Sequence, residues 1–146
     1  MEILAHIHSG LRWIVLILML AAIFMAFSGM NGGKPFNRKP ALFALISVHT
    51  QLLIGIILYI LMMNSLNWDF SAAKNDPVLR FFTMEHITGM LLAIALITVG
   101  HSRAKRGDTD KKKWKSIAIF YTIGLVLMLG AIPWPFMQKF HSLGWF

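Results

Sequence analysis

The sequence contains no cysteine and few charged residues. Of its 146 residues, 14% are Asp, Glu, Lys or Arg, whereas 57% are apolar. Without cysteine the chain has no disulfide, thiolate metal site, iron–sulfur cluster or covalently attached c-type haem. Any metal chemistry therefore depends on His, Met, carboxylate or Tyr side chains. So few charges also exclude the polar surface of an ordinary soluble globule.

The apolar residues form four long blocks, with the charged residues collected between them. Each block is long enough to cross a bilayer as a helix, and turn-forming or proline-containing segments separate the blocks. We therefore expect an all-α, integral membrane four-helix up-down bundle that forms a single domain over residues 1–146. The expected spans cover residues 3–28, 40–63, 77–101 and 114–134.

Basic residues concentrate in the first and third connections. These ten are Lys34, Arg38, Lys39, Arg103, Lys105, Arg106, Lys111, Lys112, Lys113 and Lys115. Since Lys and Arg remain on the cytoplasmic side, both termini are predicted to lie outside. The formal charge of +8 is then an orientation signal and a match to anionic headgroups, not a sign of nucleic-acid binding. The lysines around Trp114 have a second interpretation, as a lipid or partner site.

The five tryptophans fall near the predicted ends of the spans. Aromatic residues at these positions are typical of the membrane interface. The residues concerned are Trp13, Trp68, Trp114, Trp134 and Trp145. The ten methionines show no regular clustering, which favours packing over copper binding.

Several ionisable or polar side chains fall within the predicted spans. Insertion of a charged side chain costs roughly 2.5–3.5 kcal/mol, so those that persist usually meet a partner, a cofactor or a water-filled cavity. The group comprises His6, His8, Arg12, His49, Gln51, Glu85, His86 and His101. From the rise along a helix, Arg12, Glu85 and His86 are expected at similar depth. His8 is expected one turn nearer the outside, and His49 near the midplane.

His8 and His86 form the candidate site. The first and third spans are diagonal neighbours in an up-down bundle, so a flat cofactor between them would be held from opposite sides. Two imidazoles in an apolar slot are typical of b-type haem, and Arg12 or Arg80 is suited to its propionates. The small-residue face of the third span predicts room for the macrocycle beside His86. That face contains Gly89, Met90, Ala93 and Gly100.

Other interpretations of these residues remain open. His49 and His86 form an alternative axial pair, but one offset by roughly two helical turns. A second alternative places His49 in a quinone or proton site together with Gln51 and Tyr59. A third alternative is a buried ion pair between Arg12 on the first span and Glu85 on the third.

The chain resembles a family of small four-helix membrane proteins of Gram-negative bacteria labelled cytochrome b or cytochrome b-like. Four separate stretches carry the resemblance. They are His8-Ser9-Gly10-Leu11-Arg12-Trp13, His49-Thr50-Gln51-Leu52-Leu53-Ile54-Gly55 with Tyr59, Arg80-Phe81-Phe82-Thr83-Met84-Glu85-His86, and Pro133-Trp134-Pro135-Phe136. The resemblance covers nearly the whole length. It implies haem b, electron transfer, the bacterial inner membrane, and family positions at His8, His49 and His86.

Three functional hypotheses follow. The first is a b-type cytochrome that passes electrons between the quinone pool and a partner on the outer face. Its axial ligands are His8 and His86, with His49, Gln51 and Glu85 as a proton or quinone site. The second is a haem-free accessory subunit of a larger respiratory or other membrane complex. The third is a metal site built from histidines and Glu85. The sequence does not decide whether the protein is an enzyme.

Overall fold

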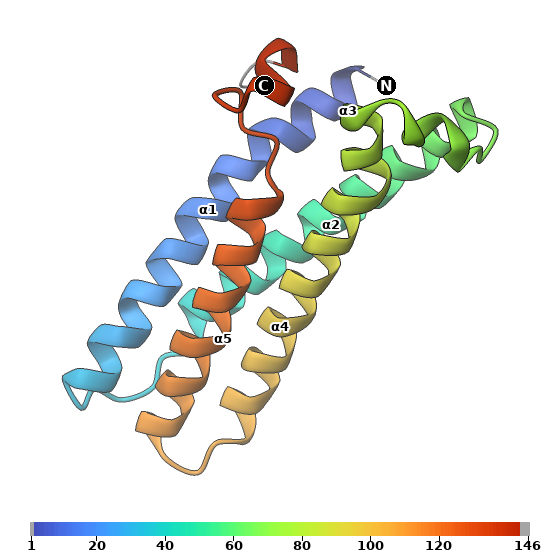
Figure 1. Ribbon diagram of the computed structural model, residues 1–146. Helices are drawn as coiled ribbons and strands as arrows, with labels where there is room; N and C mark the ends of the chain where they lie inside the picture. The colour runs from blue at the N-terminus through green and yellow to red at the C-terminus, as the bar shows by residue number, and fades with distance from the viewer. Residues whose placement is uncertain (1, 144–146) are drawn as a thin grey trace.

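The computed structural model describes residues 2–143, and these residues contain helices and no strand (Figure 1). The elements are α1 (Glu2–Asn31), α2 (Lys39–Ser65), the 3₁₀ helix η1 (Phe70–Lys74), α3 (Pro77–Arg80), a π-helical turn (Phe81–His86), α4 (Ile87–Arg106), α5 (Asp110–Ala131) and the 3₁₀ helix η3 (Gln138–Leu143). The segment from α3 to α4 is continuous, so four helical segments are long and apolar enough to cross a membrane. The predicted all-helical architecture is therefore confirmed.

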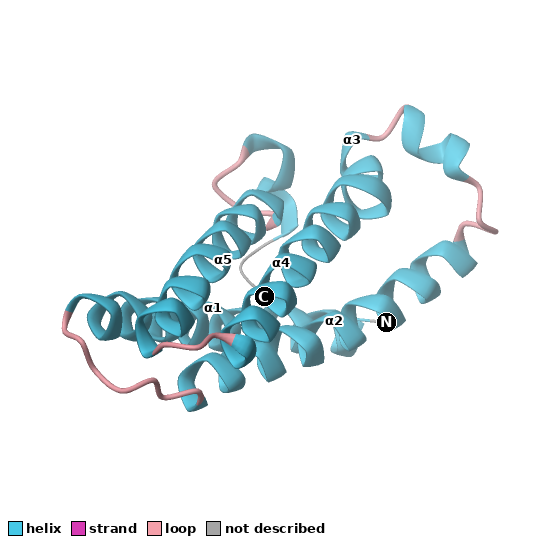
Figure 2. Ribbon diagram, turned by 90° about the horizontal axis from the view of Figure 1, so that it is seen from below, coloured by secondary structure: helices cyan, strands magenta, loops and turns pink. Residues whose placement is uncertain are grey.

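The four long helices run side by side (Figures 1 and 2). α5 packs along both α1 and α4, and α1 also packs along α2, whereas α2 meets α4 over a shorter stretch. α1 and α4 are therefore diagonal. The start of α1, the π turn and η3 gather at one end, which we call the terminal end. The connections 32–38 and 107–109 lie at the opposite, basic end.

Small residues allow the helices to approach closely. A Cβ atom at Gly124 on α5 would lie 2.5 Å from Cγ1 of Ile97 on α4, so a larger residue would force the two helices apart. Close approach of this kind is typical of helices that cannot rely on the hydrophobic effect for association. The most deeply buried core residues include Met19, Ala26, Ala44, Val48, Ala93, Ile97, Ile117 and Tyr121.

Three predicted boundaries of the third and fourth spans were wrong. The fourth helix begins at Asp110 because Thr109 caps it, the hydroxyl accepting the Lys112 N–H at 3.3 Å. It ends at Ala131, because Ile132 precedes Pro133 and is extended (φ −79°, ψ 133°). The third helical segment continues beyond residue 101 to Arg106.

Trp114 does not face outward, as a residue of an interfacial aromatic belt would. Its side chain is 3% exposed and its Nε1 donates to the Lys34 carbonyl at 2.9 Å. Gly29 provides the space for the indole, and the Phe36 ring packs against it with centroids 4.7 Å apart. The predicted position of Trp145 lies outside the described residues. Trp114 therefore joins α1, the first connection and α5 at the basic end.

A hydrogen-bonded chain links three helices in the same half of the bundle. The Tyr121 hydroxyl donates to the Ala41 carbonyl at 2.8 Å, and His101 Nδ1 lies 3.2 Å from the same hydroxyl oxygen. Because the hydroxyl proton is used on Ala41, Nδ1 of His101 is the donor in the second bond. Tyr121 thereby ties α5 to α2 and α4.

We expect Tyr121→Phe to lower the free energy of unfolding by about 1–3 kcal/mol, because the His101 Nδ1–H and the Ala41 carbonyl lose their partner in a buried site. Denaturant titration of the detergent-solubilised protein, followed by circular dichroism, measures this change. Tyr59→Phe is the matched control, since that half-buried hydroxyl makes one longer bond of 3.3 Å. Equal stabilities of the two variants would contradict the assignment.

Candidate functional site at the terminal end

The end of α5 fixes the position of His86. Pro133 prevents the helix from continuing, and Pro135 has no N–H to donate to the carbonyl of Ala131. His86 fills that vacancy, with its Nδ1 2.8 Å from the Ala131 oxygen. Since a carbonyl only accepts, Nδ1 is the donor, and Nε2 of the neutral ring keeps its lone pair. Both the orientation and the tautomer of His86 are therefore set.

His8 approaches His86 from the diagonal helix. The two ring centroids are 6.3 Å apart and the ring planes make an angle of 73°. Gly55 on α2 provides the space for the His8 ring, because a Cβ atom there would lie 3.0 Å from Cε1. The side-chain amide of Gln51, one turn before Gly55, donates to the His8 backbone carbonyl at 2.6 Å. α2 thus holds the turn of α1 that carries His8.

The two imidazoles do not hydrogen-bond to each other. Nδ1 of His8 is buried and has no hydrogen-bond partner among the described residues. Within residues 2–143, the His86 ring makes one hydrogen bond, and it uses Nδ1. Two imidazoles in direct proximity therefore keep unshared nitrogen atoms, which is the requirement for binding a metal ion between them.

The π turn surrounds His86 with aromatic rings. A π-helical turn contains an additional residue and occurs frequently at functional sites. The rings of Phe81 and Phe82 lie 5.8 and 6.0 Å from the His86 ring. The buried hydroxyl of Thr83 donates back to the Leu79 carbonyl at 2.8 Å, and the Tyr59 hydroxyl donates to the Thr83 carbonyl at 3.3 Å. Tyr59 therefore braces the π turn from α2.

Arg12 lies one turn beyond His8 on α1 and is half-buried. Its guanidinium carbon is 5.3 Å from the Trp13 ring centroid and 5.8 Å from that of Trp134. The two indoles themselves meet at 6.1 Å. The aromatic rings therefore stabilise a cation close to the histidine pair.

The alternative in which Arg12 and Glu85 form a buried ion pair was wrong. Glu85 lies at the surface of the π turn, where its two carboxylate oxygens meet Arg80 Nε at 3.1 Å and Lys139 Nζ at 3.5 Å. The carboxylate is 45% exposed, so it avoids the cost of burial that an interhelical position would impose. Glu85 therefore forms its ion pairs at the surface of the terminal end and not in the core of the bundle.

A C-terminal cap covers the π turn. We use this name for η3 and its buried residue Phe140, which is 2% exposed and packs on Phe81 at a centroid distance of 4.5 Å. Lys139 Nζ lies 4.7 and 5.0 Å from the Phe81 and Phe140 ring centroids, and it also binds Glu85. Sequence reasoning missed this cap, although a lysine between aromatic residues was a signal for it. The cap covers the aromatic rings that surround His86.

His49 is remote from the pair. Its Nδ1 lies 2.9 Å from the Leu45 carbonyl, and its Nε2 lies 3.4 Å from the Thr98 hydroxyl. Thr98 follows His86 by twelve residues, a separation of about 18 Å along the helix. The alternative axial pair of His49 and His86 was therefore wrong, and so was a metal site that combines His49 with His8, Glu85 and His86. Within residues 2–143 no group of three His, Cys, Asp or Glu is arranged to hold a metal ion.

The small-residue face of the third helical segment does not provide the expected space. A Cβ atom at Gly89 would lie 2.9 Å from the Ala131 Cβ, Gly100 faces Phe120, and Ala93 is fully buried in the core. These residues bring α4 against α5. Gly55 on α2 is instead the glycine that gives space beside the histidine pair.

Comparisons with family models, with curated proteins and with solved structures gave no match for this chain. The likeness to cytochrome b-like proteins therefore depends on the sequence motifs alone.

We expect Phe140→Ala to increase amide hydrogen exchange in η3 and the π turn by about ten- to a hundredfold, because burial of a Phe side chain contributes roughly 1.5–3 kcal/mol. Exchange measured by mass spectrometry on peptides from the terminal end tests this. Phe136→Ala is the control, because that side chain is 69% exposed and should leave exchange unchanged. A similar response of both variants would mean that Phe140 does not hold the cap.

Proposed function

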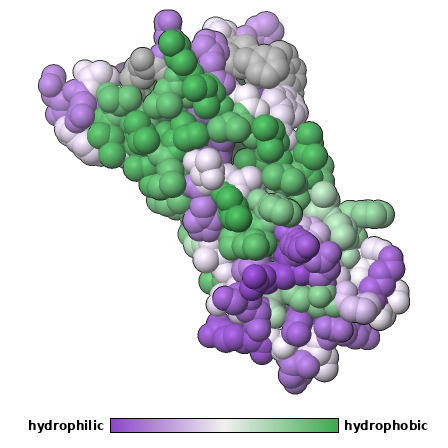
Figure 3. Space-filling model, turned by 180° about the vertical axis from the view of Figure 1, so that it is seen from behind, coloured by the Kyte–Doolittle hydropathy of each residue, from purple (hydrophilic) through white to green (hydrophobic). Residues whose placement is uncertain are grey.

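We propose that the chain spans a bacterial inner membrane four times, with the basic end in the cytoplasm and the terminal end outside. Large apolar side chains lie exposed in the middle of the long helices, including Ile17 (65%), Phe24 (74%) and Leu53 (64%). A bilayer would cover them. Figure 3 shows apolar residues over much of one face and polar residues gathered at the basic end. The lysines and arginines of the two basic connections support the orientation.

Within that membrane, we propose that the protein is a b-type cytochrome whose haem iron is bound by His8 and His86. The single observation that carries the proposal is the 6.3 Å separation of the two rings on diagonal helices. Imidazoles that bind opposite sides of one metal ion, through bonds of about 2 Å, have ring centroids about 6 Å apart. The separation of the pair therefore supports the proposal that His8 and His86 would hold the haem iron between them.

The surroundings of the pair also suit a haem. Histidine ligands usually donate their second ring N–H to a carbonyl or carboxylate, as His86 does to Ala131. The guanidinium of Arg12, held among indoles one turn from His8, is suited to neutralising a propionate. The aromatic π turn and the C-terminal cap exclude water from the side that carries His86.

The proposed activity is electron transfer. A haem held by both His8 and His86 would leave no iron position for a substrate, and the chemistry it would supply is one-electron exchange. A carrier confined to the bilayer would exchange electrons with membrane quinone and with a partner at the outer face. Membership of a larger respiratory complex is compatible with this role, since the chain has little surface outside the membrane.

The decisive measurement is the absorption spectrum of detergent-solubilised protein from its native membrane. We expect a Soret band that sharpens on reduction with dithionite, one haem per chain, and loss of that haem in both His8→Ala and His86→Ala. His49→Ala is the matched control and should retain haem, because His49 lies about 18 Å along the bundle. Colourless, folded wild-type protein that comigrates with a larger complex would instead favour the haem-free accessory subunit.

A second measurement concerns Arg12. Replacement by Gln should lower the midpoint potential by several tens of millivolts, because a nearby positive charge favours the reduced iron and about 1 kcal/mol corresponds to about 40 mV for one electron. Spectroelectrochemical titration gives the value. Arg103→Gln serves as the control, since that guanidinium lies over Phe120 near the basic end. If both variants kept the wild-type potential, the propionate role would be excluded.

A further inference from the structure

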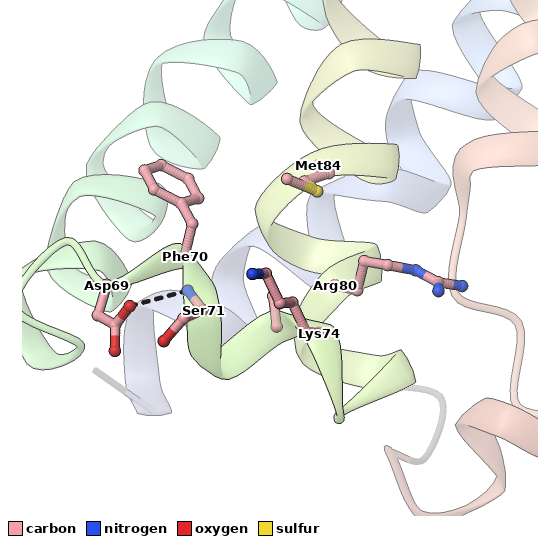
Figure 4. A pocket seen from close by; sticks show the side chains of 7 residues that line it. Asp69, Phe70, Ser71, Lys74, Arg80 and Met84 are labelled. Atoms are coloured by element: carbon pink, nitrogen blue, oxygen red, sulfur yellow. Dashed lines mark hydrogen bonds between the residues drawn. The ribbon is translucent and has the colours of Figure 1, made fainter.

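A second candidate site lies at the terminal end, between η1 and the helical segment that begins at α3. It is a pocket of about 410 Å³ (Figure 4). Its volume is within the usual range of roughly 300–1,000 Å³ for small-molecule sites. The lining residues are Asp69, Phe70, Ser71, Ala73, Lys74, Arg80 and Met84. The pocket therefore combines an apolar wall with two cationic side chains.

Lys74 is the cation available to a ligand. Its exposed side chain lines the pocket together with those of Phe70 and Met84 (Figure 4), and it forms no ion pair with any other described residue. Arg80 is already engaged by Glu85 at 3.1 Å. An unpaired ammonium in a pocket with two apolar side chains fits an anion that is attached to an apolar body.

Asp69 is the one acidic residue that lines the pocket, and it acts as a helix cap. Asp69 caps η1 by accepting the Ser71 N–H at 2.8 Å. Hydrogen bonds from Ser71 lower the pKa of this carboxyl, so the cap remains ionised at neutral pH. In Figure 4 the Asp69 carboxylate turns toward Ser71, and no ion pair joins it to Lys74. The carboxylate therefore does not neutralise the ammonium.

The position of the pocket identifies the kind of anion. α2 ends at Ser65 and α3 begins at Pro77, so η1 lies where the chain leaves and re-enters the proposed bilayer. Phe70 and Met84 beside it are 43% and 47% exposed. A phosphate at the level of the headgroups, with apolar chains directly below it, matches this combination of charge and apolar surface.

We propose that this pocket binds an anionic phospholipid of the outer leaflet, with Lys74 on the phosphate and with Phe70 and Met84 against the start of the acyl chains. The proposal rests on the membrane embedding in the proposed function and is independent of the haem. A lipid held here would fix η1 against the first turn of the segment that carries His86.

Native mass spectrometry of the full chain, titrated in detergent with phosphatidylglycerol and separately with phosphatidylcholine, tests the site. We expect one tightly bound phosphatidylglycerol, at least fivefold weaker binding in Lys74→Gln, and weaker binding of phosphatidylcholine to the wild type. The matched control is Lys139→Gln, which removes an outward cation that belongs to the C-terminal cap and should not change lipid binding.

Two further arms separate the possible outcomes. Phe70→Ser should weaken phosphatidylglycerol binding while leaving the fold intact, because the side chain is partly exposed. Millimolar inorganic phosphate should not displace the lipid; displacement would indicate a site for free phosphate and overturn the proposal. Equal binding by Lys74→Gln and the wild type, or equal binding of both lipids, would overturn it as well. Haem content measured on the same samples reports separately on the His8 and His86 pair.

Discussion

The terminal end of the molecule depends on how α5 stops. A helix that ends inside an apolar environment leaves carbonyl groups that must find donors. Pro133 ends α5, and Pro135 cannot supply an N–H, so the carbonyl of Ala131 takes its donor from His86 on the neighbouring helix. One hydrogen bond thereby satisfies the helix end, fixes the imidazole ring and leaves its second nitrogen available. The same hydrogen bond therefore satisfies the Ala131 carbonyl and fixes the geometry of the candidate site.

The two ends of the bundle differ in how their polar groups are used. At the basic end, Trp114 and Tyr121 complete hydrogen bonds to backbone carbonyls, and His101 is bonded to Tyr121. Each of these polar side chains has a partner within the fold, which is a structural role. At the terminal end, His8 has a buried nitrogen without such a partner among the described residues, although it lies beside another histidine. The side chains on which both proposals depend therefore lie at the terminal end.

Sequence patterns predicted the four helices, the diagonal arrangement and the pairing of His8 with His86, because each depends on segment length, short connections and helical rise. They did not predict the partners of Glu85. Helical depth places Glu85 level with Arg12, but the π turn directs the carboxylate to Arg80 and Lys139 at the surface. Glycines were also ambiguous in the sequence: a small residue gives space to a cofactor or to a neighbouring helix, and Gly89 gives it to α5. Only the packing of whole helices resolves such cases.

The histidine pair lacks the hydrogen bond that would be expected if its only role were to join two helices. Two histidines that only joined helices would gain a net stabilisation of about 0.5–1.5 kcal/mol by bonding to each other, and an unsatisfied buried nitrogen costs about 1–3 kcal/mol. The rings stand edge to face at 6.3 Å without such a bond. Gly55 and Gln51 further hold His8 in this position, and Ala131 holds His86. The pair is therefore held from both sides without a hydrogen bond between its two rings, and this is the feature that the proposed metal ligation would explain.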